Sequence, residues 1–220
     1  MAGEDHVATA KAVYDMTAPA YVRFVGTEIS AATEGPIDQS LLVAFVELVK
    51  RRSIERVADI GCGPGRAAAF MAARGLDVVG VDISQAMLSV ARSAHPHIKF
   101  EEGQLDALPF ETGVFGGAVC WYSIIHTPPG RLAEAFAELT RVLMPGGYLL
   151  LAFQAEDEPI HRANAHGTHL PLTSYRHSVQ DIADRLEDLD FRIYTTVLRA
   201  PDLENETTFQ GFVIASSPTS

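Results

Sequence analysis

The sequence predicts an α/β fold: a seven-stranded sheet, mostly parallel with its last strand antiparallel, and helices on both faces. Between residues 56 and 153, short runs that are apolar throughout alternate with helical patterns, which is typical of parallel strands covered on both faces. Two further strands near the end are joined by a connection too short for a helical crossover, so they should pair antiparallel. At 220 residues, the chain is long enough to form one domain, 1–220.

The composition indicates a cytoplasmic protein with a small-molecule ligand. The net charge of −11 would repel a nucleic-acid backbone, so we expect no nucleic-acid partner. No apolar run reaches the roughly 18–20 residues of a membrane helix, and residues 1–11 do not resemble a signal peptide. The two cysteines, Cys62 and Cys120, cannot form a disulfide framework. We therefore expect no membrane partner, and the oligomeric state is unknown.

Residues 1–52 are expected to form an N-terminal helical cap, or lid. Apolar positions at helical spacing in residues 4–25 are interrupted by Pro19, which predicts two short helices or one kinked helix. A Gly-Pro pair at 35–36 marks a break. Asp38 can then cap a helix that runs to about Arg52.

Residues 56–153 are expected to form the core of the sheet. A Pro-Gly-Gly run at 145–147 should end the last helix of this region before its last strand begins. The expected strands are 57–60, 78–81, 98–101, 114–121 and 148–153, and the expected helices are 66–74, 84–94 and 131–143.

Residues 155–177 interrupt the alternation of strands and helices and hold four of the eight histidines. Because irregular segments after sheet strands usually carry specificity, we expect a substrate-side insert here. Residues 178–216 should form a closing helix and hairpin. The hydroxyl of Ser178 can form a capping box with Asp181, and the last two strands are expected at 191–198 and 208–215.

A glycine turn follows the first strand of the core, and it predicts a nucleotide-sized cradle. Gly61, Gly63 and Gly65 allow a sharp turn and close approach of a ligand to the backbone. Asp82 ends the next strand about 20 residues later, where an acid can accept both hydroxyls of a ribose. The two features together indicate a cofactor that contains adenosine.

The acid that precedes the turn favours one cofactor over the others. A dinucleotide fingerprint would be G-x-G-x-x-G, but the spacing here is G-C-G-P-G, with Asp59 two residues before the first glycine. A carboxylate at this place would repel a pyrophosphate and can meet an ammonium group. S-adenosylmethionine carries an ammonium group, a sulfonium and no phosphate, so the pattern favours it over NAD or FAD.

Five motifs in order resemble a class I S-adenosylmethionine-dependent methyltransferase, of the small-molecule branch that includes the ubiquinone and menaquinone methyltransferases. The resemblance implies the Rossmann-like seven-stranded sheet of that family and S-adenosylhomocysteine as the product. The motifs are VADIGCGPG (57–65), VVGVDIS (78–84), GQLDALPF (103–110), VCWYSIIHTPP (119–129) and RVLMPGGYLLLAF (141–153).

The same resemblance implies roles for the matching residues around the cofactor. The methionine portion would lie by Asp59, Gly61, Cys62, Gly63 and Gly65, with Trp121 and Tyr122 beside it. The ribose would bind Asp82, and the adenine would lie near Ile83 and Met87, with its amino group at Gln104, Leu105 and Asp106. Tyr14 or Tyr21 would close over the cofactor.

Structural interpretations compete with these roles. Asp59 can cap the following helix, while Asp82 and Asp106 can be ordinary turn acids. Trp121 and Tyr122 can be core residues. The sequence alone leaves these alternatives open.

His126 is the candidate catalytic residue, because it follows the fourth strand and histidine can take a proton near neutral pH. The alternative is that it braces the Thr-Pro-Pro turn after it. In the insert, the spacing of the histidines fits no metal signature, so we expect no metal. The candidate substrate contacts there are His161, His169, Tyr175 and His177.

The sequence therefore predicts in-line transfer of a methyl group to an oxygen, nitrogen or carbon of a small molecule. The sulfonium is already a good leaving group, so positioning and desolvation would supply most of the catalysis. Two alternatives remain. The protein can bind S-adenosylmethionine or S-adenosylhomocysteine without methylating, or it can be an NAD-linked oxidoreductase.

Overall fold

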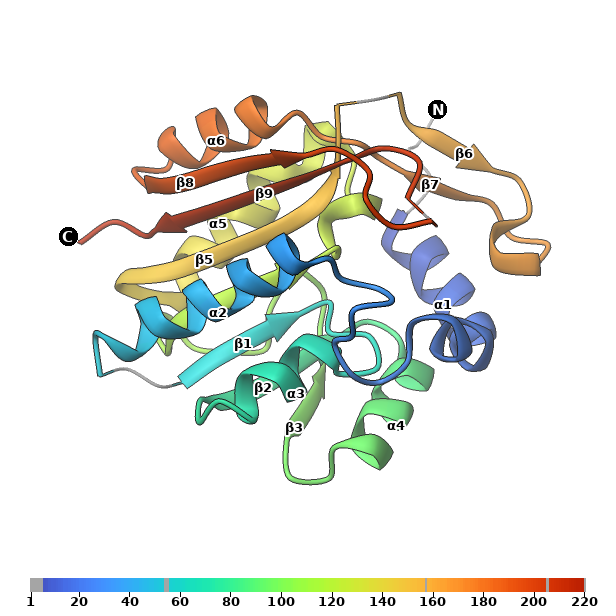
Figure 1. The fold of residues 1–220 in the computed structure, drawn as a ribbon, viewed down its shortest axis with the longest axis horizontal. Coiled ribbons are helices and arrows are strands. Elements are labelled where there is room, and N and C mark those ends of the chain that lie inside the picture. The colour runs from blue at the N-terminus through green and yellow to red at the C-terminus, as the bar shows by residue number, and fades with distance from the viewer. Residues whose placement is uncertain (1–5, 54–55, 157, 205, 220) are drawn as a thin grey trace.

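The computed structural model describes residues 6–53, 56–156, 158–204 and 206–219. Its main sheet has seven strands in the order β3-β2-β1-β4-β5-β9-β8 (Figure 1). Only β9 runs against its neighbours β5 and β8, and the other strand pairs are parallel, as the sequence predicts. The strands are β1 (Arg56–Ile60), β2 (Asp77–Asp82), β3 (Lys99–Glu102), β4 (Phe115–Trp121), β5 (Leu143–Ala155), β8 (Arg192–Arg199) and β9 (Phe209–Ser216).

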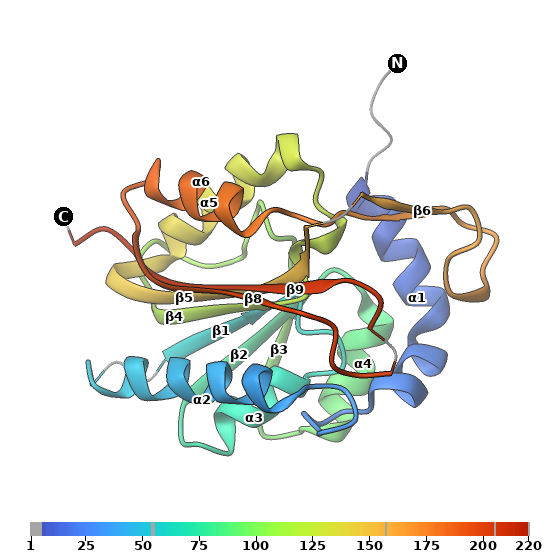
Figure 2. The ribbon, with the colours of Figure 1, turned by 45° about the horizontal axis from the view of Figure 1, so that its top comes forward.

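Helices cover both faces of this sheet, as Figure 2 shows. Side chains from α2 (Pro36–Lys50), α3 (Arg66–Ala72) and α4 (Gln85–Ala94) pack in the core of one face. Side chains from α5 (Leu132–Val142) and α6 (Val179–Glu187) pack in the core of the other. Burial on both faces explains why the central strands are apolar throughout.

The strand order changes direction between β1 and β4, and this positions the site. β2 and β3 extend from one side of β1, while β4 and β5 extend from the other. In such sheets, ligands bind beyond the carboxyl ends of the strands at this switch point. Helix α1 (His6–Val25) lies across this end of the sheet (Figures 1 and 2). It is one continuous helix that contains Pro19.

The insert contains a small hairpin that the sequence analysis did not predict. Strand β6 (Ile160–Arg162) pairs antiparallel with β7 (Leu172–Ser174), and a short 3₁₀ turn, η3 (Ala165–Gly167), lies between them. Buried Leu172 and Ala165 pack on Ala10 and Val13 of α1. The hairpin therefore depends on contacts with a distant helix, which no local pattern records.

Three predicted element ends differ from the structure. Helix α2 begins at Pro36, so Asp38 is not its N-cap but its third residue, and its carboxylate accepts a hydrogen bond from the Gly35 N–H. Strand β5 already begins at Leu143, through the Pro-Gly-Gly run, because Leu143 pairs with Phe115 across an irregular register. The Ser178 hydroxyl does cap α6, but the expected second half of its capping box is replaced by a salt bridge between Asp181 and Arg185.

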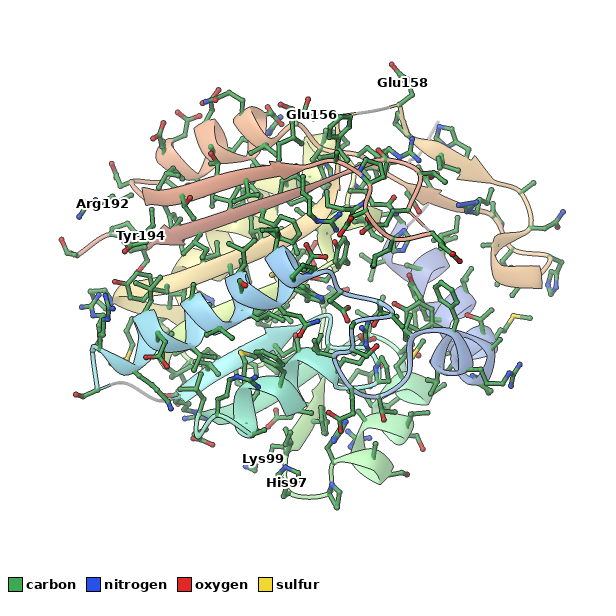
Figure 3. The ribbon with its side chains drawn as sticks, viewed as in Figure 1. His97, Lys99, Glu156, Glu158, Arg192 and Tyr194 are labelled. Atoms are coloured by element: carbon green, nitrogen blue, oxygen red, sulfur yellow. The ribbon has the colours of Figure 1, made fainter. Side chains whose placement is uncertain are left out.

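Two pairs of side chains mark the surface away from the cavity. Arg192 and Tyr194 lie on edge strand β8, on the side of the molecule away from α1, and Glu156 and Glu158 lie where the chain leaves β5 for the insert (Figure 3). Among the described residues, no helix is both long enough and apolar enough to cross a membrane.

Candidate functional site

A cavity of about 970 Å³, counted out to its open mouth, lies at the carboxyl ends of β1, β2 and β4 beneath α1. Its lining of glycine backbone, carboxylates and aromatic rings suits a nucleoside cofactor. Most residues predicted for the cofactor meet here. Those that line the cavity are Tyr14, Tyr21, Gly61, Gly63, Asp82, Ile83, Met87, Gln104, Leu105, Asp106, Trp121 and Tyr122, together with the candidate catalytic residue His126.

The glycine turn has the conformation that its sequence predicts. Gly61, Gly63 and Gly65 all have positive φ, at 72°, 52° and 87°, in the left-handed region that favours glycine. A Cβ at Gly61 would lie 2.2 Å from the Cβ of Ser123, whereas one at Gly63 would meet nothing within 4 Å. The turn is therefore packed against the loop that follows β4 on one side and is open to the cavity at Gly63.

Asp82 joins this turn to the end of β2. One carboxylate oxygen, Oδ2, accepts from the Gly63 N–H at 2.8 Å, and the other, Oδ1, accepts from the Ser84 N–H at 2.8 Å. Burial raises the pKa of Asp82, and these two backbone donors oppose that effect. Each carboxylate oxygen can accept more than one hydrogen bond. Asp82 can therefore hold the turn and still accept a ribose hydroxyl from the cavity.

Asp59 is fully buried and does not line the cavity. Its Oδ2 accepts from the Ala68 N–H at 2.8 Å, as a helix-capping acid would, while its Oδ1 has no hydrogen-bond partner among the described residues. Burial raises the pKa of Asp59 to about 7, and the charge of Asp82 adds to this. One buried oxygen is thus left without the donor that such atoms normally have.

Cys62 and Gly65 face away from the cavity. Burial raises the pKa of the Cys62 thiol well above its ordinary value, so it is not a reactive thiolate but fills space between the turn and β2. A Cβ at Gly65 would lie 3.0 Å from both His95 and Phe100. Gly65 therefore serves the packing of α3 against its neighbours.

Asp106 lines the cavity from the segment after β3. Its Oδ2 lies 3.5 Å from a guanidinium nitrogen of Arg131, a cavity residue that the sequence analysis missed. Its Oδ1 is buried and has no partner among the described residues. A buried, unpaired carboxylate oxygen in a cavity wall is suited to accept a hydrogen bond from a ligand's amino group.

His126 is held between α1 and the insert. Its Nδ1 lies 2.7 Å from the carbonyl oxygen of Thr173, and its Nε2 lies 2.8 Å from the hydroxyl of Tyr14. Because a carbonyl can only accept, Nδ1 carries the hydrogen of the neutral ring, so Nε2 accepts from the Tyr14 hydroxyl. The nitrogen that can take a proton is therefore aimed at a cavity residue.

Aromatic residues form the roof and one wall of the cavity. The rings of Tyr14 and Tyr21 meet edge to face at 5.6 Å, and those of Trp121 and Tyr122 do so at 5.7 Å. Burial raises the pKa of Tyr14 well above its ordinary value, so its hydroxyl stays protonated in the free protein. Tyr122 has a φ of 61°, which is uncommon for a residue with a side chain and typical of functional turns.

Two charged residues fasten α1 over the cavity, and the sequence analysis missed both. The carboxylate of Asp15 accepts from the Ser84 hydroxyl at 2.6 Å and from the Ala86 N–H at 3.2 Å, at the start of α4. Lys11 donates to the Ile83 carbonyl and to Glu102. These contacts tie the lid to the segment that follows Asp82. No local signal in the sequence marks them, because their partners are about 70–90 residues away.

The structure does not gather the predicted substrate contacts of the insert. His161 is exposed and bonds to the Thr173 hydroxyl, and His169 is exposed as well. His177 is buried, donates to the Ile124 carbonyl, and has a pKa that burial lowers. Only Tyr175 reaches a hollow, which adjoins the cavity at His126. No group of three or more metal-binding side chains occurs within the part of the chain that the structure describes.

Comparisons with known proteins agree with this geometry. Residues 57–147 match the family model described as a methyltransferase domain. The chain is 33% identical over 144 residues to malonyl-[acyl-carrier protein] O-methyltransferase of Erwinia billingiae, covering 56% of this chain and 57% of the relative. It is 36% identical over 98 residues to demethylmenaquinone methyltransferase of Renibacterium salmoninarum, covering 44% of this chain and 40% of the relative. The chain thus spans only about half the length of these relatives.

Solved structures confirm the fold. Magnesium protoporphyrin IX methyltransferase (ChlM) from Synechocystis PCC 6803 with bound S-adenosylmethionine has a TM-score of 0.71 at 20% identity, covering 99% of both chains. The [4+2]-cyclase SpnF has a TM-score of 0.72 at 16% identity, covering 96% of both chains. Residues 57–147 thus match a methyltransferase-domain model, in agreement with the family that the sequence motifs resemble.

Proposed function

We propose that the protein transfers a methyl group from S-adenosylmethionine to an oxygen, nitrogen or carbon of a small molecule. The observation that carries this proposal is the position of Asp82. Its carboxylate joins the glycine turn to the start of α4 through Gly63 and Ser84 and faces the cavity. An acid at this point suits a ribose and disfavours a phosphate.

Two unpaired oxygens support the choice of cofactor. The Oδ1 of Asp106 lines the cavity wall and suits the amino group of adenine, with Ile83 and Met87 offering apolar contacts to the ring. The Oδ1 of Asp59 does not line the cavity, so it can serve a positively charged group there only through a water molecule. When bound, the cofactor would supply a methyl group on a positively charged sulfur.

The chain's own residues would position the acceptor and remove its proton. His126 can take a proton at Nε2 through the hydroxyl of Tyr14, while the Thr173 carbonyl holds the ring in the required tautomer. The aromatic lid of Tyr14 and Tyr21 excludes water from the reacting atoms. Positioning and desolvation carry most of the rate enhancement, because the leaving group needs no further activation.

We also propose a cytoplasmic location and a single domain, 1–220, in which residues 1–52 cap the core, residues 155–177 face the acceptor, and residues 178–216 close the sheet. The net charge of −11 supports the absence of a nucleic-acid partner.

The E. billingiae relative is named for a substrate on a carrier protein. We infer a free small molecule for this chain, because α1 covers the cavity and leaves only a partly open mouth.

One other function has a specific observation in its favour. The fold is shared with a structure described as a [4+2]-cyclase, so a chain of this shape can have an activity other than methyl transfer. An NAD-linked oxidoreductase is disfavoured, because the glycine turn lacks the G-x-G-x-x-G spacing of a dinucleotide site.

Calorimetry separates these functions. We expect S-adenosylhomocysteine to bind and NADH not to bind, and the reverse result would contradict the cofactor assignment. If S-adenosylhomocysteine binds, incubation with methyl-labelled S-adenosylmethionine and a metabolite extract should label a small-molecule product. Binding without any labelled product would favour the non-methylating function.

A further inference from the structure

A second hollow, here called the outer hollow, lies against the cofactor cavity. It has a volume of about 720 Å³ including its open side. Its walls are His6 and Thr9 of α1, His126 and Pro128 of the loop after β4, and residues 171–173 with Tyr175 of the insert. His6 and His126 line both the outer hollow and the cofactor cavity. A molecule in the outer hollow would therefore lie next to the candidate catalytic residue.

We propose that the outer hollow binds the methyl acceptor, and that the acceptor is a neutral ring with a hydroxyl group, which receives the methyl group on its oxygen. This inference rests on the proposed function and names its substrate class. Three features of the walls carry it: their charge, their shape, and the proton acceptor that they share with the cofactor cavity.

The charge of the walls indicates a neutral acceptor. Among the described residues that line the outer hollow, none is an aspartate, glutamate, lysine or arginine. A carboxylate or phosphate on the acceptor would find no lysine or arginine there, only the imidazoles of His6 and His126, and an ammonium group would find no carboxylate. A neutral molecule meets neither penalty.

The shape and polarity of the walls favour a ring with few polar groups. Pro128, Pro171 and Leu172 present apolar surface, and Tyr175 adds an aromatic ring. These apolar groups suit one face of an aromatic or conjugated ring. The other described wall residues, His6, Thr9, His126 and Thr173, carry polar side chains that can bind a hydroxyl group on the ring.

The Tyr14–His126 pair determines which acceptor atom reacts. A hydroxyl group that enters the cofactor cavity past His126 meets the Tyr14 hydroxyl, which already donates to Nε2 at 2.8 Å. The acceptor's O–H bond breaks as its proton passes to the Tyr14 oxygen, and the proton of Tyr14 passes to Nε2 of His126. The acceptor oxygen forms the new C–O bond as the C–S bond breaks and its electron pair stays on sulfur. One positive charge thereby moves from sulfur to the imidazole, so atoms and charges balance.

The proposal can be tested with two probes of similar shape, the neutral 2-naphthol and the anionic 2-naphthoate. Each is titrated into the protein saturated with S-adenosylhomocysteine. We expect the neutral 2-naphthol to bind about tenfold more tightly than the anion, because the anion would be desolvated without a lysine or arginine partner. With S-adenosylmethionine, 2-naphthol should be converted to its methyl ether.

A charge variant makes the test independent of the absolute affinity. Thr9→Lys places a cation in the outer hollow, so it should shift the preference toward 2-naphthoate by about tenfold. The matched control is Ala12→Lys, which adds the same charge at an exposed residue of α1 that lines neither cavity. The ratio of the two affinities in this control should equal that of the unmodified protein.

Three outcomes would overturn the proposal: no binding of 2-naphthol, a Thr9→Lys variant whose preference equals that of Ala12→Lys, or a methyl group found on a ring carbon. In each of these cases, binding of S-adenosylhomocysteine would leave the proposed function intact. Failure to bind S-adenosylhomocysteine would instead overturn the proposed function, and this inference with it.

Discussion

The hydroxyl of Tyr14 lies 2.8 Å from Nε2 of His126, although 112 residues separate them in the sequence. The tyrosine belongs to the lid helix and the histidine to the loop after β4. Any movement of α1 away from the cavity would therefore separate the two residues that we propose accept the proton. The same helix carries the aromatic rings that would exclude water from the reacting atoms.

Substitution of His126 should slow turnover and spare cofactor binding. We expect His126→Gln to lower kcat by roughly 10²–10⁴-fold, the usual contribution of a positioned acid or base, with little change in the affinity for S-adenosylhomocysteine. Tyr14→Phe should have a similar effect, and the double variant should be little worse than either single variant, because the two residues act as one unit. Steady-state kinetics and calorimetry measure both quantities, and unchanged rates in the single variants would remove the pair from the mechanism.

Substitution of Asp82 should abolish cofactor binding. Asp82→Ala removes the predicted ribose contact and leaves the N–H groups of Gly63 and Ser84 without their acceptor. A loss of at least about 3 kcal/mol in binding is expected, since a buried acceptor of several hydrogen bonds is lost. Calorimetry with S-adenosylhomocysteine measures the loss, and thermal unfolding checks that the variant is folded. An unchanged affinity in a folded variant would contradict the ribose assignment.

Asp59 should make stability depend on pH. Burial raises its pKa to about 7, whereas in the unfolded chain it titrates near 4. The stability that goes with the protonated form is fully present below about pH 4 and is lost as the pH rises through 7, by a few kcal/mol. Asp59→Asn should therefore be more stable than the unmodified protein at pH 8, and this advantage should shrink at pH 5. Denaturant unfolding at the two pH values tests this, and an equal difference at both would rule it out.

The contacts of Asp15 should control how long the cofactor stays bound. Asp15→Ala removes the hydrogen bonds of the lid to Ser84 and Ala86, so S-adenosylhomocysteine should dissociate several times faster. The control is Glu47→Ala, which removes an exposed acid of α2 far from the lid. Stopped-flow displacement measures the rates. If both variants released the ligand equally fast, the contacts of Asp15 with Ser84 and Ala86 would have no role in holding the cofactor.

The guanidinium of Arg199 should stabilise the fold, away from the site. It is bound by Asp38 at 2.8 Å and by Glu206 at 2.6 Å, and all three side chains are nearly buried. Burial of Glu206 opposes its ionisation, but Arg199 and the backbone N–H groups of Asp202 and Leu203 together lower the pKa of Glu206 to about 2. Arg199→Met should cost about 3–5 kcal/mol by leaving two acids without a cation. Arg185→Met, at a more exposed pair, should cost less than about 1 kcal/mol. Equal losses in denaturant unfolding would contradict this account.

The sheet and most of the cavity wall could be predicted because they depend on local pattern. Apolar runs identify the strands, and residues that directly follow parallel strands meet at one edge. Asp82 and Trp121 meet in the cavity for this reason. The same rule places Asp59 near the turn, but it cannot decide whether the carboxylate faces the ligand or the Ala68 N–H, because that depends on one side-chain rotamer.

What could not be predicted depends on contacts between distant segments. Each strand of the β6–β7 hairpin is only three residues long, and the hairpin is held by packing of Leu172 on α1. The lid contacts of Lys11 and Asp15 likewise have partners far along the chain. The histidines of the insert share a segment in the sequence, yet His161 and His169 are exposed, whereas His177 lies beyond the hairpin, next to the end of β5, and is buried.

The central claim is that this chain moves a methyl group from S-adenosylmethionine to a small molecule. The most direct test is incubation with S-adenosylmethionine labelled on its methyl carbon and a metabolite extract, followed by mass spectrometry of the small-molecule fraction. The account predicts a labelled product and one equivalent of S-adenosylhomocysteine for each product formed. Tight binding of S-adenosylhomocysteine with no label in any small molecule would contradict it.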